Sequence, residues 1–280
     1  MTHVLVTGAA GGIGSAIAEA FAAQAAFLTL SDRDVDALRA TAARIEGSTA
    51  IRAADLTDPD AASDLVEQSW AAHGPVDILV NAAGVYPSLD MADVDAESWD
   101  RLFAVNLRAP VLTTAALARL AAAAGRPASV VNISSGSALR SRPGGGPYAS
   151  SKAALEMATR AAALELGALG IRVNAVSPGF VLVDSDVNPV SAEYARSIDV
   201  NPLGRPGTPE DVARAVCWLA GPEASWITGE TVRVDGGSST GALHLPRIWQ
   251  ADGTRATHAR AATHAEAPVG AGTTTEEATR

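Results

Sequence analysis

Tyr148 and Lys152, four residues apart, are the side chains in this sequence best suited to proton transfer. On a helix, this spacing puts both on one face. A free tyrosine titrates near pH 10, so its pKa must fall by about 3 units to exchange a proton with an alcohol or carbonyl near neutrality. A lysine ammonium about 4 Å away, at an effective dielectric constant of about 20, supplies roughly that much. The alternative is a surface tyrosine beside a lysine, but Lys152 is the only lysine of the chain.

Two further polar residues could complete a site around this pair. Ser135 follows an apolar run and lies 13 residues before Tyr148, across a loop rich in glycine and proline. A hydroxyl there can hydrogen-bond a substrate oxygen as charge develops on it. Asn106 lies inside a long helical pattern, where asparagine is a poor helix former. We expect it to bond to backbone or to hold a water that feeds protons to Lys152. The expected lining of the substrate pocket is Tyr86, Ser137, Leu139, Phe180 and the loop 184–200.

A glycine-rich turn near the N-terminus predicts a site for a pyrophosphate. Gly8, Gly12 and Gly14 lie between the first apolar run and a helical pattern. Backbone N–H groups at a helix N-terminus bind phosphate where no side chain intervenes. Ile17 stands at the last glycine position of the usual G-x-G-x-x-G pattern, so an ordinary glycine turn is the alternative for this motif alone.

Asp32, at the end of the second apolar run, bears on the choice of dinucleotide. A carboxylate there can hydrogen-bond both hydroxyls of the adenosine ribose. It would repel a 2′-phosphate by several kcal/mol at about 5 Å and an effective dielectric constant of about 20. We therefore predict NAD, with NADP less favoured. Arg33 would soften the preference, and Gly11 offers no basic side chain to a 2′-phosphate. Asp32 could also serve as a helix N-cap.

Short apolar runs alternate with amphipathic stretches. We expect strands at 4–6, 27–31, 49–53, 76–80, 129–133, 171–176 and 231–234, and helices at 13–25, 35–46, 58–73, 96–124, 148–166 and 209–220. This alternation indicates an α/β fold with a single doubly wound, seven-stranded parallel sheet, Rossmann-like, with helices on both faces. Ligands of such sheets bind beyond the carboxyl ends of the strands.

We expect one dinucleotide-binding and catalytic domain over residues 1–241. Its substrate loop is expected at about 180–203, with a short helix near 191–198. A C-terminal extension over 242–280 has almost no apolar residues after Trp249 and is expected to be disordered from about 251. The extension holds three of the five histidines, without acidic or cysteine partners at ligand spacing. We therefore expect no metal site.

Composition narrows the partners. The net charge is −10 and no basic stripe is present, which disfavours nucleic acid. We predict no signal peptide and no membrane-spanning segment, because no run approaches ~20 apolar residues. Cys217 is the only cysteine, so no intramolecular disulfide can form. A cytoplasmic protein with a small-molecule partner is the expectation.

Taken in order along residues 1–241, these features resemble the short-chain dehydrogenases/reductases in their compact single-domain form. The motifs that carry the resemblance are the T-G-x-x-x-G-x-G turn at 7–14, Asp55 in Ala-Asp-Leu-Thr-Asp, Asn-Ala-Ala-Gly at 81–84, Asn106, Ser135, Tyr148, Lys152, Pro178-Gly179, and Val-Asp-Gly-Gly at 234–237. Two positions depart from the family pattern. Ala82 replaces a frequent second asparagine, and Val183 stands where a threonine often bonds the nicotinamide carboxamide.

The resemblance implies a role for each residue of the cluster. Tyr148 would be the general acid/base, Lys152 would bind the nicotinamide ribose and lower the tyrosine pKa, Ser135 would orient the substrate oxygen, and Asn106 would hold the relay water. Asp55 would contact adenine, and the backbone of Val181 would replace the missing threonine. The resemblance also implies a homotetramer. The expected cofactor-binding residues are Gly8, Gly12, Ile13, Gly14, Asp32, Arg33, Asp55, Leu56, Asn81, Ala83, Gly84, Tyr148, Lys152, Pro178, Gly179 and Val181.

The expected activity is hydride transfer between NAD(H) and a secondary alcohol or the matching ketone. Two alternatives stay open. One is an NADPH-dependent ketoreductase acting on 3-oxoacyl groups. The other is a catalytically silent regulator that has kept the cofactor fold, although such proteins usually lose the tyrosine or the lysine.

Overall fold

The computed structural model describes residues 1–183, 201–243 and 245. Residues Met1–His244 form one compact unit. The helix expected near 191–198 and the disorder expected from 251 fall outside the described residues. The division into residues 1–241 and 242–280 therefore stays a prediction.

Seven parallel strands of the described chain form one sheet, in the order β3-β2-β1-β4-β5-β6-β7. The strands are β1 (His3–Thr7), β2 (Phe27–Asp32), β3 (Thr49–Ala53), β4 (Ile78–Asn81), β5 (Ala128–Ile133), β6 (Ile171–Pro178) and β7 (Thr231–Val234). β1, β4 and β5 are buried along their whole length. Such strands are short apolar runs because helices cover both of their faces. The predicted fold class is confirmed.

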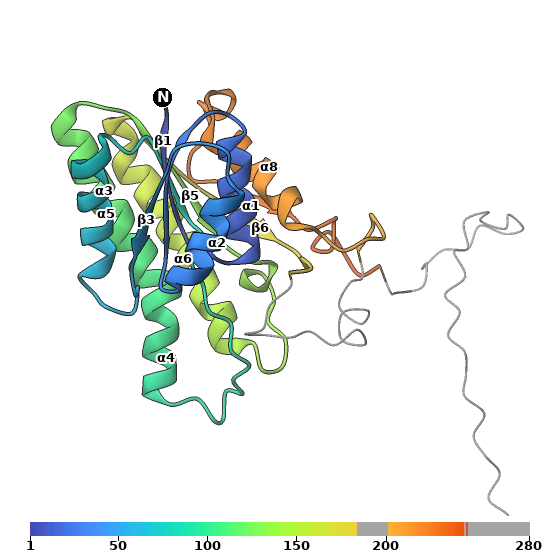
Figure 1. Ribbon diagram of the computed structural model, residues 1–280. Helices are drawn as coiled ribbons and strands as arrows, with labels where there is room; N and C mark the ends of the chain where they lie inside the picture. Colours follow the sequence, from blue (N-terminus) through green and yellow to red (C-terminus); the bar gives the residue numbers. More distant parts are fainter. Residues whose placement is uncertain (184–200, 244, 246–280) are drawn as a thin grey trace, which may run out of the picture. The chain divides into compact units, whose positions relative to one another are not determined.

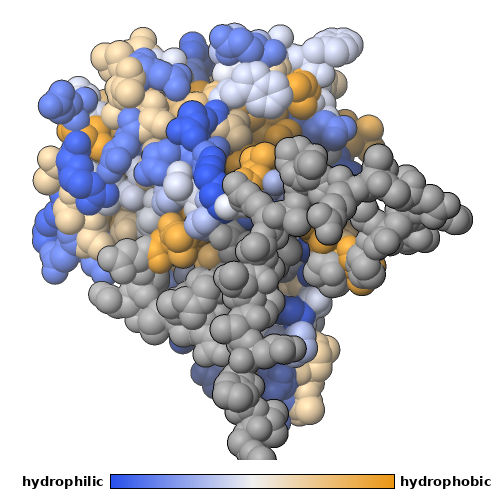
Figure 2. Space-filling model, turned by 90° about the vertical axis from the view of Figure 1, so that its right-hand side faces the viewer, coloured by the Kyte–Doolittle hydropathy of each residue, from blue (hydrophilic) through white to orange (hydrophobic). Residues whose placement is uncertain are grey.

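Helices cover the sheet in two layers (Figure 1). The helices are α1 (Gly12–Ala22), α2 (Val35–Arg44), α3 (Ala61–His73), α4 (Ala96–Phe103), α5 (Ala109–Ala124), α6 (Gly146–Leu166) and α8 (Pro209–Ala220). One core lies under α1, α2 and α8, around Ile17, Leu38 and Val216. The other lies under α3, α5 and α6, around Leu65, Leu117 and Ala163. On the face of the molecule shown in Figure 2, hydrophilic and hydrophobic residues are mixed across the visible coloured surface.

Several elements differ from the sequence prediction: α1 ends at Ala22 rather than 25, α2 ends at Arg44 rather than 46, α6 begins at Gly146 rather than 148, and β4 spans Ile78–Asn81 rather than 76–80. Two further differences have a clear cause. α3 begins at Ala61 rather than at residue 58, because the Asp58 carboxylate accepts a hydrogen bond from the Asp60 N–H at 3.0 Å and holds a turn there. The helix predicted over 96–124 contains a π-helical turn, Ala104–Arg108, between α4 and α5. Its end is marked by a hydrogen bond from the Ala109 N–H to the Ala104 carbonyl, five residues back.

By length and composition, the helical stretch Ala96–Ala124 could cross a membrane. Its apolar side chains have another use. Ala116, Leu117 and Ala121 are buried in the core beneath α3 and α5. A helix that packs against a sheet in this way needs the same apolar composition.

The amino-terminal edge of the sheet carries two polar clusters, one around the buried His3 and one around the half-buried Arg172. His3 Nδ1 lies 3.1 Å from the Gly74 carbonyl, and Nε2 lies 2.9 Å from Thr29 Oγ1. Arg172 donates hydrogen bonds of 2.9–3.2 Å to four carbonyl oxygens at the end of α8 and in the loop before β7. Those carbonyls belong to Leu219, Ala220, Gly221 and Ile227. Arg172 thus closes a helix end that has no intrahelical partners for its last carbonyls.

Candidate active site

The glycine turn after β1 packs directly against the loop after β4. Thr7 Oγ1 accepts a hydrogen bond from the Ala83 N–H at 3.2 Å. Gly8 has a φ of +68°, and a Cβ there would lie 2.6 Å from Ala83 Cα. A Cβ at Gly14 would lie 2.0 Å from the Gly8 carbonyl oxygen. Backbone contact therefore requires glycine at positions 8 and 14.

The N-terminus of α1 suits an anion. Its N-cap, Gly11, is extended, and no side-chain hydrogen bond caps this helix end. The first N–H groups, at Gly12, Ile13 and Gly14, thus remain donors in the positive field of the helix. This donor set fits the pyrophosphate of a dinucleotide. Val183 lies beside the turn, since a Cβ at Gly12 would meet its Cγ1 at 2.8 Å.

Asp32 binds the backbone of the glycine turn and the backbone of the segment that follows β2. Its Oδ2 accepts from the Ala10 N–H at 3.2 Å, and its Oδ1 accepts from the Arg33 N–H at 2.7 Å. The expectation that Asp32 caps α2 is wrong. Asp34 is the N-cap, because its side chain accepts from the N–H groups of Asp36 and Ala37 in the first turn. Asp32 instead holds the glycine turn against the end of β2.

The loop after β3 places the expected adenine contact at the same edge. Asp55 Oδ1 accepts from the Thr57 N–H and hydroxyl at 3.0 and 2.8 Å. These bonds lower the pKa of Asp55, and the nearby charge of Arg33 lowers it further. Arg33 thus lies close enough to Asp55 to interact with it. Leu56 is buried.

The Asn81 side chain is engaged inside the protein. Its Nδ2 donates to Asn132 Oδ1 at 2.9 Å, and its Oδ1 accepts from the Thr113 hydroxyl at 2.8 Å. Asn132 in turn donates to Thr159 Oγ1 at 2.9 Å. This buried chain links β4, β5, α5 and α6. The side chain of Asn81 is therefore a structural element beneath the expected cofactor site.

Tyr148 and Ser135 meet at the carboxyl end of β5. The Ser135 side chain lies close enough to the Tyr148 phenol to affect its pKa as a hydrogen-bond partner. Burial raises the pKa of Tyr148; Ser135 and the charge of Arg142 lower it, and Tyr86 raises it. The net shift is upward, contrary to the expectation from the spacing of Tyr148 and Lys152. The spacing alone did not reveal that Tyr148 is partly buried, which disfavours the charged phenolate.

Lys152 is buried one helical turn beyond Tyr148, with 4% of its surface exposed. Its Nζ donates to the Ile133 carbonyl at 2.8 Å and lies 5.9 Å from the centre of the Tyr148 ring. Desolvation lowers the pKa of Lys152 to about 8. The structure thus brings together the tyrosine, serine and lysine expected from the sequence, with the amine titrating closer to neutrality than an exposed lysine.

Asn106 lies in the π-helical turn and is fully buried. Its Oδ1 accepts from the Val85 N–H at 2.9 Å, and its Nδ2 donates to the Val85 carbonyl at 2.8 Å and to Ser151 Oγ at 3.1 Å. Ser151 donates to the Tyr148 carbonyl at 2.7 Å. Ser151 was not among the residues expected from the sequence, although its place one residue before Lys152 puts it on the adjoining face of the same helix. Gly84 lies between Asn106 and Lys152, because a Cβ there would be 3.5 Å from Oδ1 and 3.6 Å from Nζ.

The exit from β6 completes this edge. The Gly179 N–H donates to the Val234 carbonyl at 3.0 Å, directly after Pro178, and a Cβ at Gly179 would lie 2.7 Å from Asp235 Cα. Val181 pairs with Gly207 in an isolated bridge: the Gly207 N–H donates to the Phe180 carbonyl at 3.0 Å, and the Leu182 N–H donates to the Gly207 carbonyl at 3.1 Å. The backbone groups of Val181 therefore face away from Gly207 and remain candidates for a cofactor contact.

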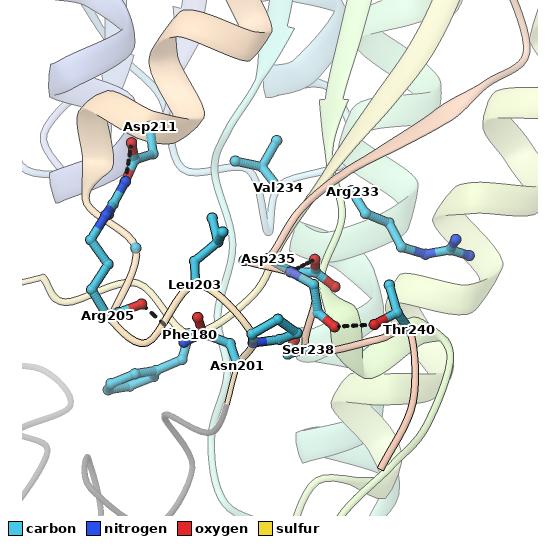
Figure 3. A pocket seen from close by; sticks show the side chains of 14 residues that line it. Phe180, Asn201, Leu203, Arg205, Asp211, Arg233, Val234, Asp235, Ser238 and Thr240 are labelled. Atoms are coloured by element: carbon cyan, nitrogen blue, oxygen red, sulfur yellow. Dashed lines mark hydrogen bonds and ion pairs between the residues drawn. The ribbon is translucent and has the colours of Figure 1, made fainter. Parts of the chain in front are cut away.

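A cavity of about 520 Å³ opens beside this exit (Figure 3). The residues that line it are Phe180, Asn201, Pro202, Leu203, Arg205, Gly207, Asp211, Arg233, Val234, Asp235, Gly236, Gly237, Ser238 and Thr240. None of the described residues that line it belongs to the Asn106, Ser135, Tyr148 and Lys152 cluster. Of the expected substrate-pocket residues, Phe180 thus lines this cavity, while the Tyr86 ring lies 6.2 Å from the Tyr148 ring. The loop 184–200 lies outside the described residues.

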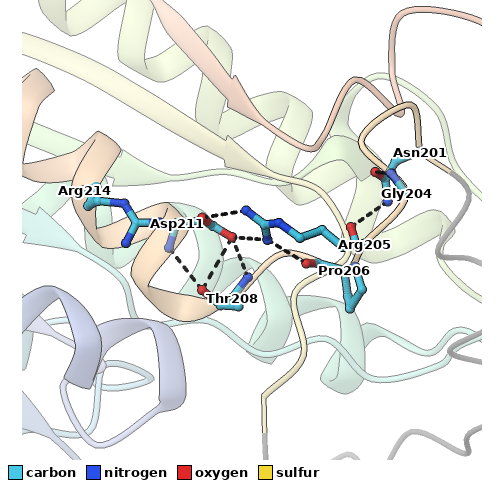
Figure 4. Close-up of polar contacts among 7 residues, drawn as sticks. All are labelled: Asn201, Gly204, Arg205, Pro206, Thr208, Asp211 and Arg214. Carbon is cyan, nitrogen blue, oxygen red and sulfur yellow. Dashed lines mark hydrogen bonds and ion pairs between the residues drawn. The ribbon is translucent and has the colours of Figure 1, made fainter.

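A charged network fixes the segment that leads from this cavity into α8 (Figure 4). Arg205 binds both carboxylate oxygens of Asp211, at 2.6 and 3.0 Å, and Arg214 binds one at 2.6 Å. Thr208 and Asp211 form a capping box. The bond from Arg205 lowers the pKa of Asp211. Both arginine side chains bind the same carboxylate, that of Asp211, which indicates a structural role for the network.

Among residues 1–183, 201–243 and 245, no three His, Cys, Asp or Glu side chains group as metal ligands.

Comparisons with known proteins match this chain to one protein family. Residues 8–239 match the family model described as enoyl-(acyl carrier protein) reductase. A sorbitol dehydrogenase of Cereibacter sphaeroides is 35% identical over 245 residues, covering 84% of this chain and 96% of that protein. A galactitol 2-dehydrogenase of the same organism is 38% identical over 237 residues, covering 83% and 92%. The solved structure of a blue fluorescent protein from a metagenomic library, in complex with NADPH, is 34% identical with a TM-score of 0.76, covering 85% and 98%.

Proposed function

The chain belongs to the short-chain dehydrogenases/reductases, oxidoreductases that act on CH–OH groups, and on that basis we propose that it oxidises a secondary alcohol with NAD, Tyr148 taking the proton. The dinucleotide accepts the hydride in this direction and donates it in the reverse one. The observation that carries the role of Tyr148 is the position of its ring 5.9 Å from Nζ of the buried Lys152, with the Ser135 side chain close to the phenol. A catalytic function accounts for the presence of Tyr148, Ser135 and Lys152 together, whereas a silent regulator would not need them.

Each residue contributes a separate step. Ser135 orients the substrate oxygen next to the phenol. Tyr148 accepts the hydroxyl proton, and Lys152, whose pKa is about 8, stabilises the phenolate by its charge. The side-chain amide of Asn106 is occupied by Val85 and Ser151. A relay water held by Asn106 would therefore bind its backbone carbonyl, in the widened turn. The amino-terminal N–H groups of α1 hold the pyrophosphate.

We infer a preference for NAD from Asp32. Its carboxylate stands at the end of β2, fixed by the Ala10 and Arg33 N–H groups. A 2′-phosphate would meet this charge, and Arg33, the nearest base in sequence, already interacts with Asp55. Replacing Asp32 by Asn keeps an acceptor for the backbone and removes the charge. The ratio of kcat/KM for NAD over NADP should then fall by roughly tenfold or more.

The central experiment is turnover with sorbitol, galactitol and simple secondary alcohols, followed at the absorbance of the reduced cofactor. Tyr148→Phe should lower kcat by about 10²–10⁴-fold, the usual contribution of a general acid/base. Ser150→Ala is the control, because it also removes one hydroxyl from α6 and its side chain is exposed. Full activity of Tyr148→Phe would sink the assignment.

The second candidate, an NADPH-dependent reductase of 3-oxoacyl thioesters, draws support from a 35% identical 3-oxoacyl-[acyl-carrier-protein] reductase of Thermotoga maritima and from the NADPH-bound structure. The same assay decides between them. Faster turnover of an acetoacetyl thioester with NADPH than of polyols with NAD would replace the first proposal.

We further propose a homotetramer located in the cytoplasm. A cavity of about 260 Å³ along α5 and α6, lined by apolar residues such as Val111, Leu155 and Ala162, offers a surface for a second subunit. Sedimentation equilibrium of the purified protein tests the assembly, and cell fractionation tests the location.

A further inference from the structure

Three turns of α6 are bonded to three consecutive residues at the end of β5. Lys152 Nζ donates to the Ile133 carbonyl, Glu156 Oε1 accepts from Ser134 Oγ, and Thr159 Oγ1 accepts from Asn132 Nδ2, at 2.8, 2.8 and 2.9 Å. Spacings of four and three residues put these helical side chains on one face. These bonds set the position of α6, which carries Tyr148, relative to β5, which leads into Ser135.

The bond between Ser134 and Glu156 is the one closest to Ser135. Ser134 is 3% exposed, and its N–H also donates to the Val176 carbonyl of β6 at 2.7 Å. Its backbone is thus held by β6 and its side chain by α6. Hydrogen bonds to a carboxylate are stronger than neutral ones, and keeping a carboxylate partly buried is costly unless it is bonded.

Resting on the proposed role of Tyr148, we propose that Glu156 is a positioning residue: by binding Ser134 it fixes the adjoining Ser135 hydroxyl against the Tyr148 phenol. Catalytic groups need placement within about 0.5 Å, and a displacement of 1 Å costs on the order of 100-fold. The bond spans 22 residues, from strand to helix, and controls the pair of elements that carry the reacting groups.

The test uses Glu156→Ala, Glu156→Gln, Ser134→Ala and the double variant Ser134→Ala/Glu156→Ala in the full chain. Glu156→Ala and Ser134→Ala should each lower kcat about tenfold with little change in KM for NAD. Glu156→Gln, which keeps an acceptor oxygen, should restore most of kcat. The double variant should be no slower than either single variant, because both remove one interaction. Glu46→Ala, an exposed glutamate after α2, is the matched control and should keep the wild-type kcat.

A second measurement does not depend on turnover. The ionisation of Tyr148 is followed as the ultraviolet difference between each protein and its Tyr148→Phe counterpart. Since the Ser135 side chain lowers the pKa of Tyr148, loosening its position in Glu156→Ala should move that ionisation to higher pH. Lys152, Tyr86 and Arg142 are the other titratable or charged groups near the phenol and stay unchanged in these variants.

The outcomes separate the two proposals. A wild-type chain without turnover, whose Tyr148 ionisation still shifts in Glu156→Ala, contradicts the proposed function and supports the positioning role. Wild-type turnover with an unshifted ionisation and unchanged kcat in Glu156→Ala overturns the positioning role, even if the melting temperature falls. Additive losses in the double variant overturn it as well.

Discussion

At the amino-terminal edge of the sheet, polar groups are bonded to other parts of the same chain, whereas at the carboxyl-terminal edge several donors are left for a ligand. Arg172 binds four carbonyls and His3 binds Gly74 and Thr29. By contrast, no side chain caps the N-terminus of α1. All strands of a parallel sheet begin at one edge and end at the other. Among the described residues, the backbone donors available to a ligand lie at the edge where the strands end. Substitutions at the two edges should therefore separate stability from function.

The largest effect is expected for Gly14→Ala. A Cβ there would lie 2.0 Å from the Gly8 carbonyl oxygen, so the backbone of the turn must move. NAD should bind roughly 10³-fold more weakly, a loss of about 4 kcal/mol. Gly11→Ala is the control, because its Cβ would lie 3.4 Å from the same oxygen and its φ is −80°. Titration of NAD against the intrinsic fluorescence measures both. Equal affinity in the two variants would refute the assignment of this turn.

Arg172→Met tests the other edge. It leaves up to four carbonyls at the end of α8 without their donor, which should cost about 2–3 kcal/mol in the free energy of unfolding. Urea unfolding measures this loss, with exposed Arg160→Met as the control. The kcat/KM of the folded variant should stay within about twofold of wild type. A large fall in kcat/KM would show that the two edges are coupled.

Burial of His3 should make the stability of the protein depend on pH. Burial lowers the pKa of His3 below its unfolded value of 6.5, so the unfolded chain binds the proton more readily. This contribution is fully present above pH 6.5 and is lost as the pH falls from there through the folded pKa, by at most about 1.4 kcal/mol per pH unit. In His3→Gln, unfolding free energies between pH 7.5 and 5.5 should change less than in wild type. If the unfolding free energy of His3→Gln depends on pH as steeply as that of wild type, His3 is not the cause of this pH dependence.

The smallest effect is expected at the surface of the same edge. Arg126 Nη2 lies 2.9 Å from Asp77 Oδ1, and the arginine side chain is 49% exposed. Arg126→Ala should lower the free energy of unfolding by less than about 1 kcal/mol. A loss as large as that of Arg172→Met would mean that burial does not decide which charges at this edge stabilise the fold.

The sheet could be predicted because each strand is a short apolar run between turn residues. β3, α8 and β7 begin and end where the sequence predicts. Tyr148 and Lys152 could also be predicted to be close, because one helix fixes their distance. Contacts local in sequence are the ones that spacing can reveal.

Contacts between distant elements could not be predicted in the same way. Whether Asp32 or Asp34 caps α2 depends on which carboxylate faces the helix, and Asp32 turns toward Ala10. The bond between Ser134 and Glu156 joins residues whose proximity arises only when α6 docks on the sheet. The upward shift of the Tyr148 pKa likewise depends on burial, which the sequence does not specify residue by residue.

The π-helical turn at Ala104–Arg108 also sets the angular relation between α4 and α5. An α-helix turns by about 100° per residue, so one residue more or less within it rotates everything beyond by that angle. Loss of a single residue from this turn would restore regular helical bonding. It would also either rotate α4 so that a different side of it faces the protein, or break the hydrogen bonds of Asn106 with Val85 and Ser151. The turn is thus a place where a length change of one residue, harmless in most loops, would reorient half of a long helix.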